Sequence, residues 1–220
     1  MFKINIQLFT AAGPSILARL NELGCGVFLD LKFHDIPNSV AGGVSSAMGL
    51  PGVRFIDLHA LGGLEMMTAS AKARDAVNGS KSPLPQLLAI TILTSMDSAS
   101  LRKVGIAGPP SKRVVQLARL AQKARMDGVV ASPQEVRAIR RACGKEFLIV
   151  VPGIRPTVDT AGKASKRNKA DDQARIATPA EAIRAGADYL VIGRPITAAP
   201  DPQSAARAIL EEISSALPSS

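Results

Sequence analysis

The chain of 220 residues contains no tryptophan, only 3% aromatic residues and only two cysteines. Cys25 and Cys143 stand alone, without the spacing of zinc ligands or of a disulfide framework, so we expect two reduced, buried thiols. No apolar run reaches the roughly 18 residues of a membrane span, and no basic region followed by an apolar core opens the chain. We therefore expect a cytoplasmic protein without a membrane partner.

Acidic residues are fewer than basic ones: the chain has 18 aspartates and glutamates against 27 lysines and arginines, which gives a net charge of +9. A basic surface of this kind suits an anionic ligand. We do not expect a nucleic-acid partner, because the positive charge is scattered and aromatic side chains for base stacking are nearly missing. A nucleic-acid binder stays open as an alternative, which steep salt dependence of duplex binding would support.

Apolar residues make up 46% of the chain, enough for a large core, and no change in composition divides it. We therefore expect one domain over residues 1–220. Short stretches rich in Val, Ile and Leu alternate with helical candidates, as in a parallel α/β sheet. The strands are expected at Phe2–Leu8, Val27–Phe33, Val53–Ala60, Leu87–Thr94, Gly128–Ser132, Phe147–Pro152 and Tyr189–Gly193. The helices are expected at about 13–23, 38–49, 64–76, 111–125, 133–142, 179–185 and 203–215.

Polar residues gather at the carboxyl ends of these strands, where the residues are Asp30, Lys32, His59, Thr94, Ser132, Arg155 and Arg194. In a (β/α)₈ barrel such ends meet at one mouth, where barrel enzymes do their chemistry. A doubly wound sheet would bring together only the strands near its switch point. The pattern therefore favours an α/β fold of the TIM (β/α)₈ type, with seven βα units instead of eight.

The segment Asp30-Leu-Lys-Phe-His-Asp-Ile-Pro-Asn-Ser39 puts three charges at the end of an apolar strand. Asp30 and Lys32 are two residues apart, so their side chains point to the same face. Asp35 follows just beyond the strand. Charges taken out of water cost several kcal/mol each unless they are paired. The cluster is therefore either a structural ion pair or a catalytic array of charges.

Five blocks in this order resemble the bacterial type of orotidine 5′-phosphate decarboxylase. They are DLKFHDIPNS from Asp30, LHALGGLEMM (58–67), TILTSM (91–96), VPGIRP (151–156) and DYLVIGRPIT (188–197). The resemblance runs from Phe2 to the C-terminus. It implies decarboxylation of orotidine 5′-phosphate to uridine 5′-phosphate and CO₂, the last step of de novo pyrimidine synthesis, without a cofactor or a metal.

The resemblance also implies roles for the charged segment. Losing CO₂ leaves a carbanion at carbon 6 of the pyrimidine, which preorganised charges must stabilise. Lys32 would stabilise and protonate this carbanion, and Asp30 would lie near the departing carboxylate and orient Lys32. Asp35 would reach into the neighbouring subunit's site, so we expect a homodimer with shared active sites.

Substrate-binding residues are carried over in the same way. Lys3 precedes Asp30 by 27 residues, the family's spacing for a lysine that contacts the ribose. Ser39 keeps a hydroxyl where the family has threonine, and Thr94 matches a threonine that contacts the pyrimidine. The remaining candidates are Arg155, Gly193 and Arg194 near the phosphate and Gln173 in the loop Pro156–Ala177, which we expect to be a lid.

His34 and His59 are expected to be structural histidines that form hydrogen bonds and take no part in acid–base chemistry. Alternatives to the main interpretation remain open. Sugar-phosphate decarboxylases and a hexulose-phosphate synthase of the same superfamily share the Asp-x-Lys-x-x-Asp pattern but use magnesium, and a catalytically inactive phosphate-binding homologue would bind nucleotide without turnover.

The start of the chain departs from the family. The family begins with a strand whose aspartate binds the ribose, followed by a helix, before the strand that holds Lys3. Met1 stands only two residues ahead of Lys3. We therefore expect the first βα unit to be missing, and the chain to be a fragment from a misplaced start or a poorly stable protein with little activity.

Overall fold

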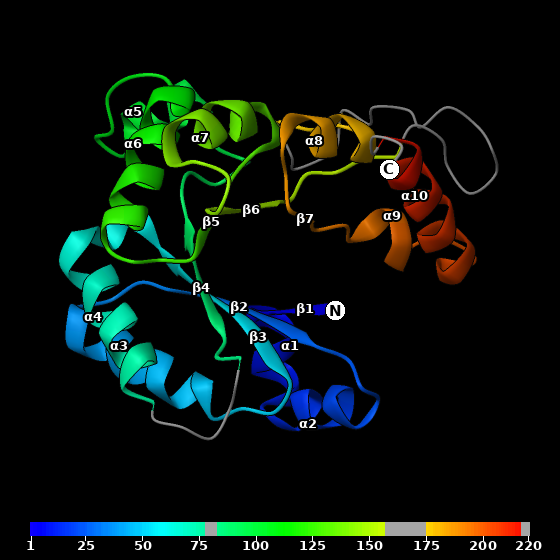
Figure 1. Cartoon of the computed structure of the whole chain (residues 1–220), viewed down its shortest axis with the longest axis horizontal. Coiled ribbons are helices and arrows are strands. Elements are labelled where there is room, and N and C mark those ends of the chain that lie inside the picture. Colours follow the sequence, from blue (N-terminus) through cyan, green and yellow to red (C-terminus); the bar gives the residue numbers. More distant parts are fainter. Residues whose placement is uncertain (78–82, 157–174, 217–220) are drawn as a thin grey trace. The chain divides into compact units, whose positions relative to one another are not determined.

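The computed structural model describes residues 1–77, 83–156 and 175–216 (Figure 1). Within these residues seven strands form a sheet in chain order. They are β1 (Phe2–Asn5), β2 (Val27–Phe33), β3 (Val53–His59), β4 (Gln86–Ile90), β5 (Gly128–Val130), β6 (Leu148–Val151) and β7 (Tyr189–Leu190). The pairs β1–β2, β2–β3, β3–β4 and β6–β7 are parallel. Parallel strands in chain order joined by helices confirm the fold of the TIM type with seven units.

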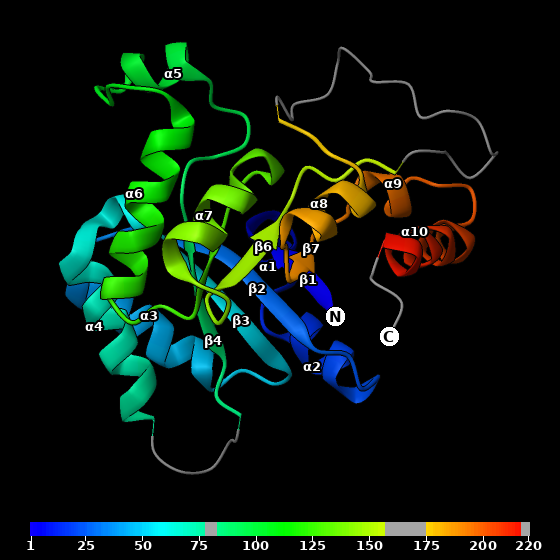
Figure 2. The same cartoon turned by 45° about the horizontal axis from the view of Figure 1, so that its top comes forward.

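Helices connect the strands (Figure 2). They are α1 (Ile6–Ala12), α2 (Ser15–Glu22), α3 (Pro37–Met48), α4 (Gly63–Ala76), α5 (Ser98–Lys103), α6 (Pro110–Lys123), α7 (Val136–Cys143), α8 (Pro179–Ala185), α9 (Arg194–Thr197) and α10 (Pro202–Ala216). Two short 3₁₀ turns, η1 (Ala60–Gly62) and η2 (Pro133–Glu135), precede α4 and α7. Of the helices described, none combines the length and the apolar character needed to cross a membrane.

The chain divides into two compact units. Unit 1 comprises Met1–Thr91 and Gln116–Val129, and unit 2 comprises Ile92–Val115 and Val130–Ser220. In unit 1, α3 and α4 lie side by side in both views and contact each other (Figures 1 and 2). The core of unit 1 consists of apolar side chains of the strands and of α4, including Leu29, Ile56, Leu58, Met66, Met67 and Leu87. In unit 2, α10 packs against α8 and α9.

The first predicted strand, Phe2–Leu8, is wrong in its second half. The strand ends at Asn5, whose side chain accepts a hydrogen bond from the Leu8 N–H at 3.0 Å and so caps α1. Asparagine is among the residues that favour this position at the start of a helix. The capping preference of Asn5 therefore outweighs the alternating pattern, and an unpredicted helix, α1, precedes α2, which corresponds to the helix predicted at about 13–23.

Two further strands are shorter than predicted. The strand expected to reach Thr94 ends at Ile90, because Leu93–Met96 form a turn closed by the Met96 N–H and the Leu93 carbonyl at 2.9 Å. The strand expected to reach Gly193 ends at Leu190, and Arg194 already begins α9. Thr94 therefore lies in a turn and Arg194 in a helix, both beyond the strand ends.

Side-chain hydrogen bonds cap the starts of η2, α8 and α5. The Ser132 hydroxyl accepts the Gln134 N–H at 3.3 Å, and Thr178 and Glu181 form a reciprocal capping box at the start of α8. Helix α5 was not predicted, although Asp97 caps it by accepting the Ser100 N–H at 2.8 Å. Both cysteines are free, as expected; Cys143 is buried, whereas Cys25 is only half-buried.

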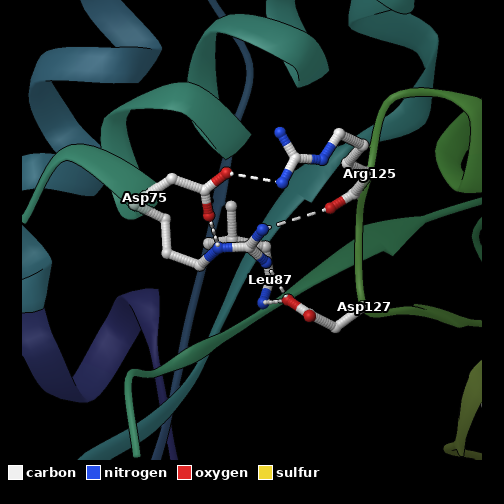
Figure 3. Close-up of polar contacts among 5 residues, drawn as sticks. Asp75, Leu87, Arg125 and Asp127 are labelled. Carbon is white, nitrogen blue, oxygen red and sulfur yellow. Dashed lines mark hydrogen bonds and ion pairs between the residues drawn. The ribbon is translucent and has the colours of Figure 1, made fainter. Parts of the chain in front are cut away.

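Asp127 links two strands and a helix of unit 1 just before β5 begins (Figure 3). Its Oδ2 accepts the Leu87 N–H at 2.7 Å, and its own N–H donates to the Leu87 carbonyl at 3.0 Å. The same oxygen pairs with the Arg74 guanidinium of α4, which also binds Asp75 at 2.9 Å. We call this arrangement the Asp127 clamp.

Asp188 builds the same arrangement in unit 2, just before β7. Its Oδ2 accepts the Ile149 N–H at 2.7 Å, and its N–H donates to the Ile149 carbonyl at 3.0 Å. The partner arginine is Arg140 of α7, which binds Asp188 at 2.7 Å. Arg140 also donates to four carbonyl oxygens, those of Gly144, Lys145, Phe147 and Gly186. We call this arrangement the Asp188 clamp.

Candidate active site

The backbone of β2 is irregular where the charged segment begins. Pairing with β3 is regular at Leu29, is interrupted, and resumes at Phe33. Within the interruption Lys32 has a φ of +52°, a left-handed conformation that residues other than glycine seldom adopt. Irregularities of this kind re-aim side chains beside active sites, and a strained residue persists only where its surroundings hold it. The Lys32 side chain is therefore placed by an unusual backbone.

Asp30 stands between two lysines. Its Oδ2 accepts a hydrogen bond from the Lys3 ammonium at 2.5 Å, and its Oδ1 accepts one from the Lys32 ammonium. Only 4% of Asp30 is exposed, while about a third of each lysine side chain reaches solvent. Strand pairing places Lys3 on β1 beside β2. Unit 1 thus brings Lys3, Asp30 and Lys32 together, and we call these three residues the charge triad.

The charge of Asp30 is strongly favoured. Burial by itself would raise the pKa of Asp30, but hydrogen bonding with Asp57, Lys3 and Lys32 outweighs burial and lowers this pKa to about 2. An adjacent positive charge favours the ionised carboxylate. Asp30 is therefore an anion at neutral pH, and it holds the two ammonium groups at fixed positions.

Asp57 of β3 is a site residue that the sequence analysis did not identify. It is 0% exposed, and its Oδ1 accepts the backbone N–H of Lys32 at 2.8 Å. Burial, followed by the negative charge of Asp30, raises the pKa of Asp57 well above its ordinary value. The sequence contains a pattern that could have identified Asp57 as a site residue, because it is a lone carboxylate within an apolar strand, as Asp30 is.

The two histidines lie next to each other, as the sequence did not foresee. The rings of His34 and His59 stack with their centroids 5.2 Å apart and their planes 30° apart. Burial, and then the neighbouring His34 and Lys32, lowers the pKa of His59 to about 4. His59 is therefore neutral at pH 7, and its buried Nδ1 has no hydrogen-bond partner among the described residues, so the expectation of a hydrogen-bonded histidine is wrong for this nitrogen.

Asp35 and Ser39 lie beyond the end of β2. Asp35 is exposed, and its Oδ1 accepts the N–H of Ile36 at 2.6 Å. Among the described residues Asp35 forms no ion pair with a basic side chain. Ser39 is exposed in the first turn of α3. Both side chains are accessible from outside unit 1.

The other predicted residues belong to unit 2. Thr94 lies in the turn after Leu93, and Gly193 and the exposed Arg194 open α9. Arg155 donates its backbone N–H to Ala177 at 2.9 Å, and its guanidinium donates to the Ile154 carbonyl at 2.9 Å. Ile154 and Ala177 form a β-bridge, so the two ends of the predicted lid are tied together. Gln173 and most of that loop lie outside the described residues.

A buried ion pair in unit 2 also escaped the sequence analysis. Arg175 and Glu135 are 7% and 3% exposed, and their side chains are 2.6 Å apart. Arg175 also donates to the Leu93 carbonyl at 3.2 Å, next to Thr94. Burial raises the pKa of Glu135, against the pull of Arg175 and Ser132. Arg175 is therefore a buried residue and not a solvated charge of the loop.

Comparison with known proteins adds independent findings. Residues 1–209 match the family model described as Orotidine 5′-phosphate decarboxylase / HUMPS family. The chain is 53% identical over 213 residues to orotidine 5′-phosphate decarboxylase of Geobacter sp. strain M21, covering 97% of this chain and 85% of that protein. It is 54% identical over 212 residues to the enzyme of the same name from Nitrosococcus oceani, covering 96% and 85% of the two chains.

A solved structure agrees with these matches. The crystal structure of orotidine 5′-phosphate decarboxylase from Lactobacillus acidophilus superposes with a TM-score of 0.81 at 36% sequence identity, covering 96% of this chain and 85% of that one. The sequence matches and the superposed structure both relate this chain to orotidine 5′-phosphate decarboxylases. The charge triad agrees with that relationship.

Proposed function

Because the chain belongs to the orotidine 5′-phosphate decarboxylase / HUMPS family, we propose that it converts orotidine 5′-phosphate to uridine 5′-phosphate and CO₂ in pyrimidine biosynthesis. The resemblance found in the sequence is confirmed at the level of the family. The observation that carries the proposal is the charge triad, in which one buried carboxylate fixes two ammonium groups.

The triad supplies what this reaction requires. When the bond between carbon 6 and the carboxylate breaks, its electron pair stays on carbon 6 and CO₂ leaves. The Lys32 ammonium stabilises the developing carbanion and then donates the proton that forms the new C–H bond. Because Asp30 fixes the ammonium group beforehand, little reorganisation is needed as the negative charge develops. Asp30 also repels the carboxylate of the bound substrate. This repulsion ends when the carboxylate departs as CO₂.

Lys3 balances the charge of Asp30. With one carboxylate between two ammonium groups, the triad carries a net positive charge, which suits an anionic substrate. We assign Lys3 to the ribose side of the substrate, since its ammonium is partly exposed and belongs to the same network. Lys3, Asp30 and Lys32 therefore act as one unit.

The binding of the rest of the substrate is assigned to the loops. We propose that Arg155, Gln173, Gly193 and Arg194 bind the phosphate and that Ser39 and Thr94 contribute hydroxyl groups to the nucleoside. A guanidinium group can form two parallel hydrogen bonds with phosphate. Arg194 is exposed, so a ligand can reach its guanidinium group.

We further propose a cytoplasmic homodimer in which Asp35 completes the site of the partner subunit. Two properties support a role for Asp35 outside its own subunit: the side chain is exposed, and no basic side chain of the described residues pairs with it. The free thiols Cys25 and Cys143 suit a reducing compartment.

The proposed function is tested by incubating the purified chain with orotidine 5′-phosphate and measuring uridine 5′-phosphate. We expect turnover that Lys32→Ala reduces by about 10³-fold or more, since both the stabilising charge and the proton are lost. Lys72→Ala, a change at an exposed lysine of α4, is the matched control and should leave turnover unchanged.

A chelator separates the main proposal from magnesium-dependent sugar-phosphate chemistry of the same family. Activity on orotidine 5′-phosphate that survives the chelator supports the proposal. Absence of uridine 5′-phosphate, or residual activity of Lys32→Ala within tenfold of the parent, would contradict it.

A further inference from the structure

The carboxyl group of Asp57 is only half satisfied by the groups around it. Its Oδ1 accepts the Lys32 N–H at 2.8 Å. Its Oδ2 is buried and has no hydrogen-bond donor within reach among the described residues. A carboxylate oxygen left unpaired in the protein interior is costly, so a buried group of this kind calls for an explanation.

The neighbouring charges explain the unpaired oxygen. Asp30 of β2 interacts directly with Asp57, and Lys3 of β1 pairs with Asp30 from the other side. Lys32 of β2 directs its ammonium at Asp30 and only its backbone N–H at Asp57. His59, two residues farther along β3, is neutral at pH 7. The ammonium groups of the site therefore pair directly with Asp30, whereas the charge of Lys32 acts on Asp57 only from a distance and is outweighed by burial and by Asp30.

Two adjacent buried carboxyl groups cannot both be ionised without a large repulsion. One of them must keep a proton, and the two pKa values lie far apart in the order that the contacts require, with Asp30 low and Asp57 high. A protonated carboxyl group has one accepting oxygen and one donating hydroxyl. In Asp57 the accepting oxygen is Oδ1, toward the Lys32 N–H, which leaves Oδ2 to donate.

We propose that Asp57 is a positioning residue that carries a proton on Oδ2, donates it in a hydrogen bond to the Asp30 carboxylate, and accepts the Lys32 N–H on Oδ1. In this arrangement Asp57 fixes two members of the charge triad at once. It holds the side chain of Asp30, and it holds the backbone of Lys32 in the left-handed conformation with φ of +52°. The inference rests on the proposed function for its catalytic consequence, but not for the position of the proton.

Asp57→Asn is the decisive variant, because the amide has the same shape and offers one acceptor and one donor without needing a proton. We expect Asp57→Asn to keep kcat within about threefold of the parent. Asp57→Ala removes both hydrogen bonds and should lower kcat at least tenfold, with a smaller change in KM, because the phosphate contacts are untouched.

The proton itself is tested by chemical denaturation between pH 4 and 8, which needs no activity. The unfolded carboxyl group releases its proton near pH 3.8, whereas the folded one keeps it to a higher pH. In that interval the folded parent binds one proton more than the unfolded chain, so its folding equilibrium constant falls about tenfold per pH unit. Asp57→Asn lacks this loss, so its stability relative to the parent should rise with pH and then level off.

Asp97→Asn is the matched control. The pKa of Asp97 is lowered from its ordinary value of 3.8, because its carboxylate accepts the Ser100 N–H, so above about pH 5 Asp97 is ionised in both the folded and the unfolded state. Its stability relative to the parent should stay constant from pH 5 to 8. If the stability of Asp57→Asn relative to the parent were also constant with pH, the assignment of a proton to Asp57 would be overturned. An unchanged kcat in Asp57→Ala would overturn the positioning role. If the parent itself has no turnover, the proposed function fails while the denaturation series still locates the proton.

Discussion

Arg194 tests the phosphate assignment at the scale of a single residue. The guanidinium is exposed at the start of α9, directly after Gly193. A hydrogen bond to a charged group contributes about 1.5–3 kcal/mol, so Arg194→Ala should weaken binding of uridine 5′-phosphate by roughly 10- to 100-fold. Uridine, which has no phosphate, should bind the variant and the parent equally well.

Titration calorimetry with both ligands measures this difference. Arg207→Ala, at an exposed arginine of α10 in the same unit, is the control and should affect neither ligand. Equal weakening of uridine and uridine 5′-phosphate in Arg194→Ala would remove Arg194 from the phosphate site.

Single residues also show what the sequence can and cannot predict about the site. Strand alternation predicts that Asp30 and Lys32 point to the same face, whereas Lys3 was assigned to the site from the family resemblance. Asp57 obeys the same rule of a carboxylate in an apolar strand, but its partners come from β2 through sheet pairing. Its role becomes visible only when the register of β2 and β3 is known.

The buried pair of Arg175 and Glu135 could not be predicted for a related reason. The charge of Arg175 occurs in a run of basic residues, a pattern typical of a solvated loop. Its partner Glu135 is 40 residues away in the chain. No feature of the neighbouring sequence distinguishes a basic residue whose side chain is buried in the fold from one whose side chain stays in solvent.

At the scale of an element, the Asp127 clamp joins β4, β5 and α4. Asp127→Ala removes the acceptor of the Leu87 N–H and the carboxylate that faces the largely buried Arg74 (Figure 3). A buried charge that loses its partner destabilises a protein by about 3–5 kcal/mol. Because Asp75 still pairs with Arg74, we expect a loss near the lower end, about 3 kcal/mol.

Urea denaturation of the variant measures this loss. Glu22→Ala, which breaks the exposed pair between Arg19 and Glu22, is the matched control and should change stability by less than about 1 kcal/mol. A similar small effect in both variants would show that the Asp127 clamp does not stabilise unit 1.

Element boundaries were predictable where local and tertiary preferences agree. The strand Val27–Phe33 and the helix 179–185 are confirmed, the first by an apolar run between loops and the second by its capping box. The predictions fail where two preferences of the same segment compete. Alternation in Phe2–Leu8 suggests a strand, but Asn5 satisfies a backbone donor of α1 and ends β1.

At the scale of the whole molecule, the shared active site is open to a complementation test. Lys32→Ala and Asp35→Ala should each be inactive as homodimers. In an equal mixture after subunit exchange, half of the dimers contain both chains, and one of their two sites is free of both changes. Activity should therefore recover to about a quarter of the parent.

Native mass spectrometry confirms exchange in the mixture, and parent enzyme mixed with Lys32→Ala calibrates the recovery. No recovery despite complete exchange would place Asp35 in its own subunit's site.

The sheet order was the most predictable property of the whole chain. Seven apolar stretches separated by helical segments allow few arrangements, because parallel strands need a crossover connection between them. One domain over residues 1–220 stays a prediction beside the two compact units of the chain. The sequence holds no signal for that division, since composition is uniform across the unit boundaries.

The two clamps have a consequence for how the register of the sheet is set. In each, an aspartate immediately before a strand binds both backbone groups of one residue in the preceding strand, together with an arginine from the helix before that strand. The Asp127 clamp does this for β4 and β5, and the Asp188 clamp does it for β6 and β7. The chain therefore fixes a pair of parallel strands twice by the same set of contacts, and each set comes from one consecutive helix–strand–helix–strand segment of the chain.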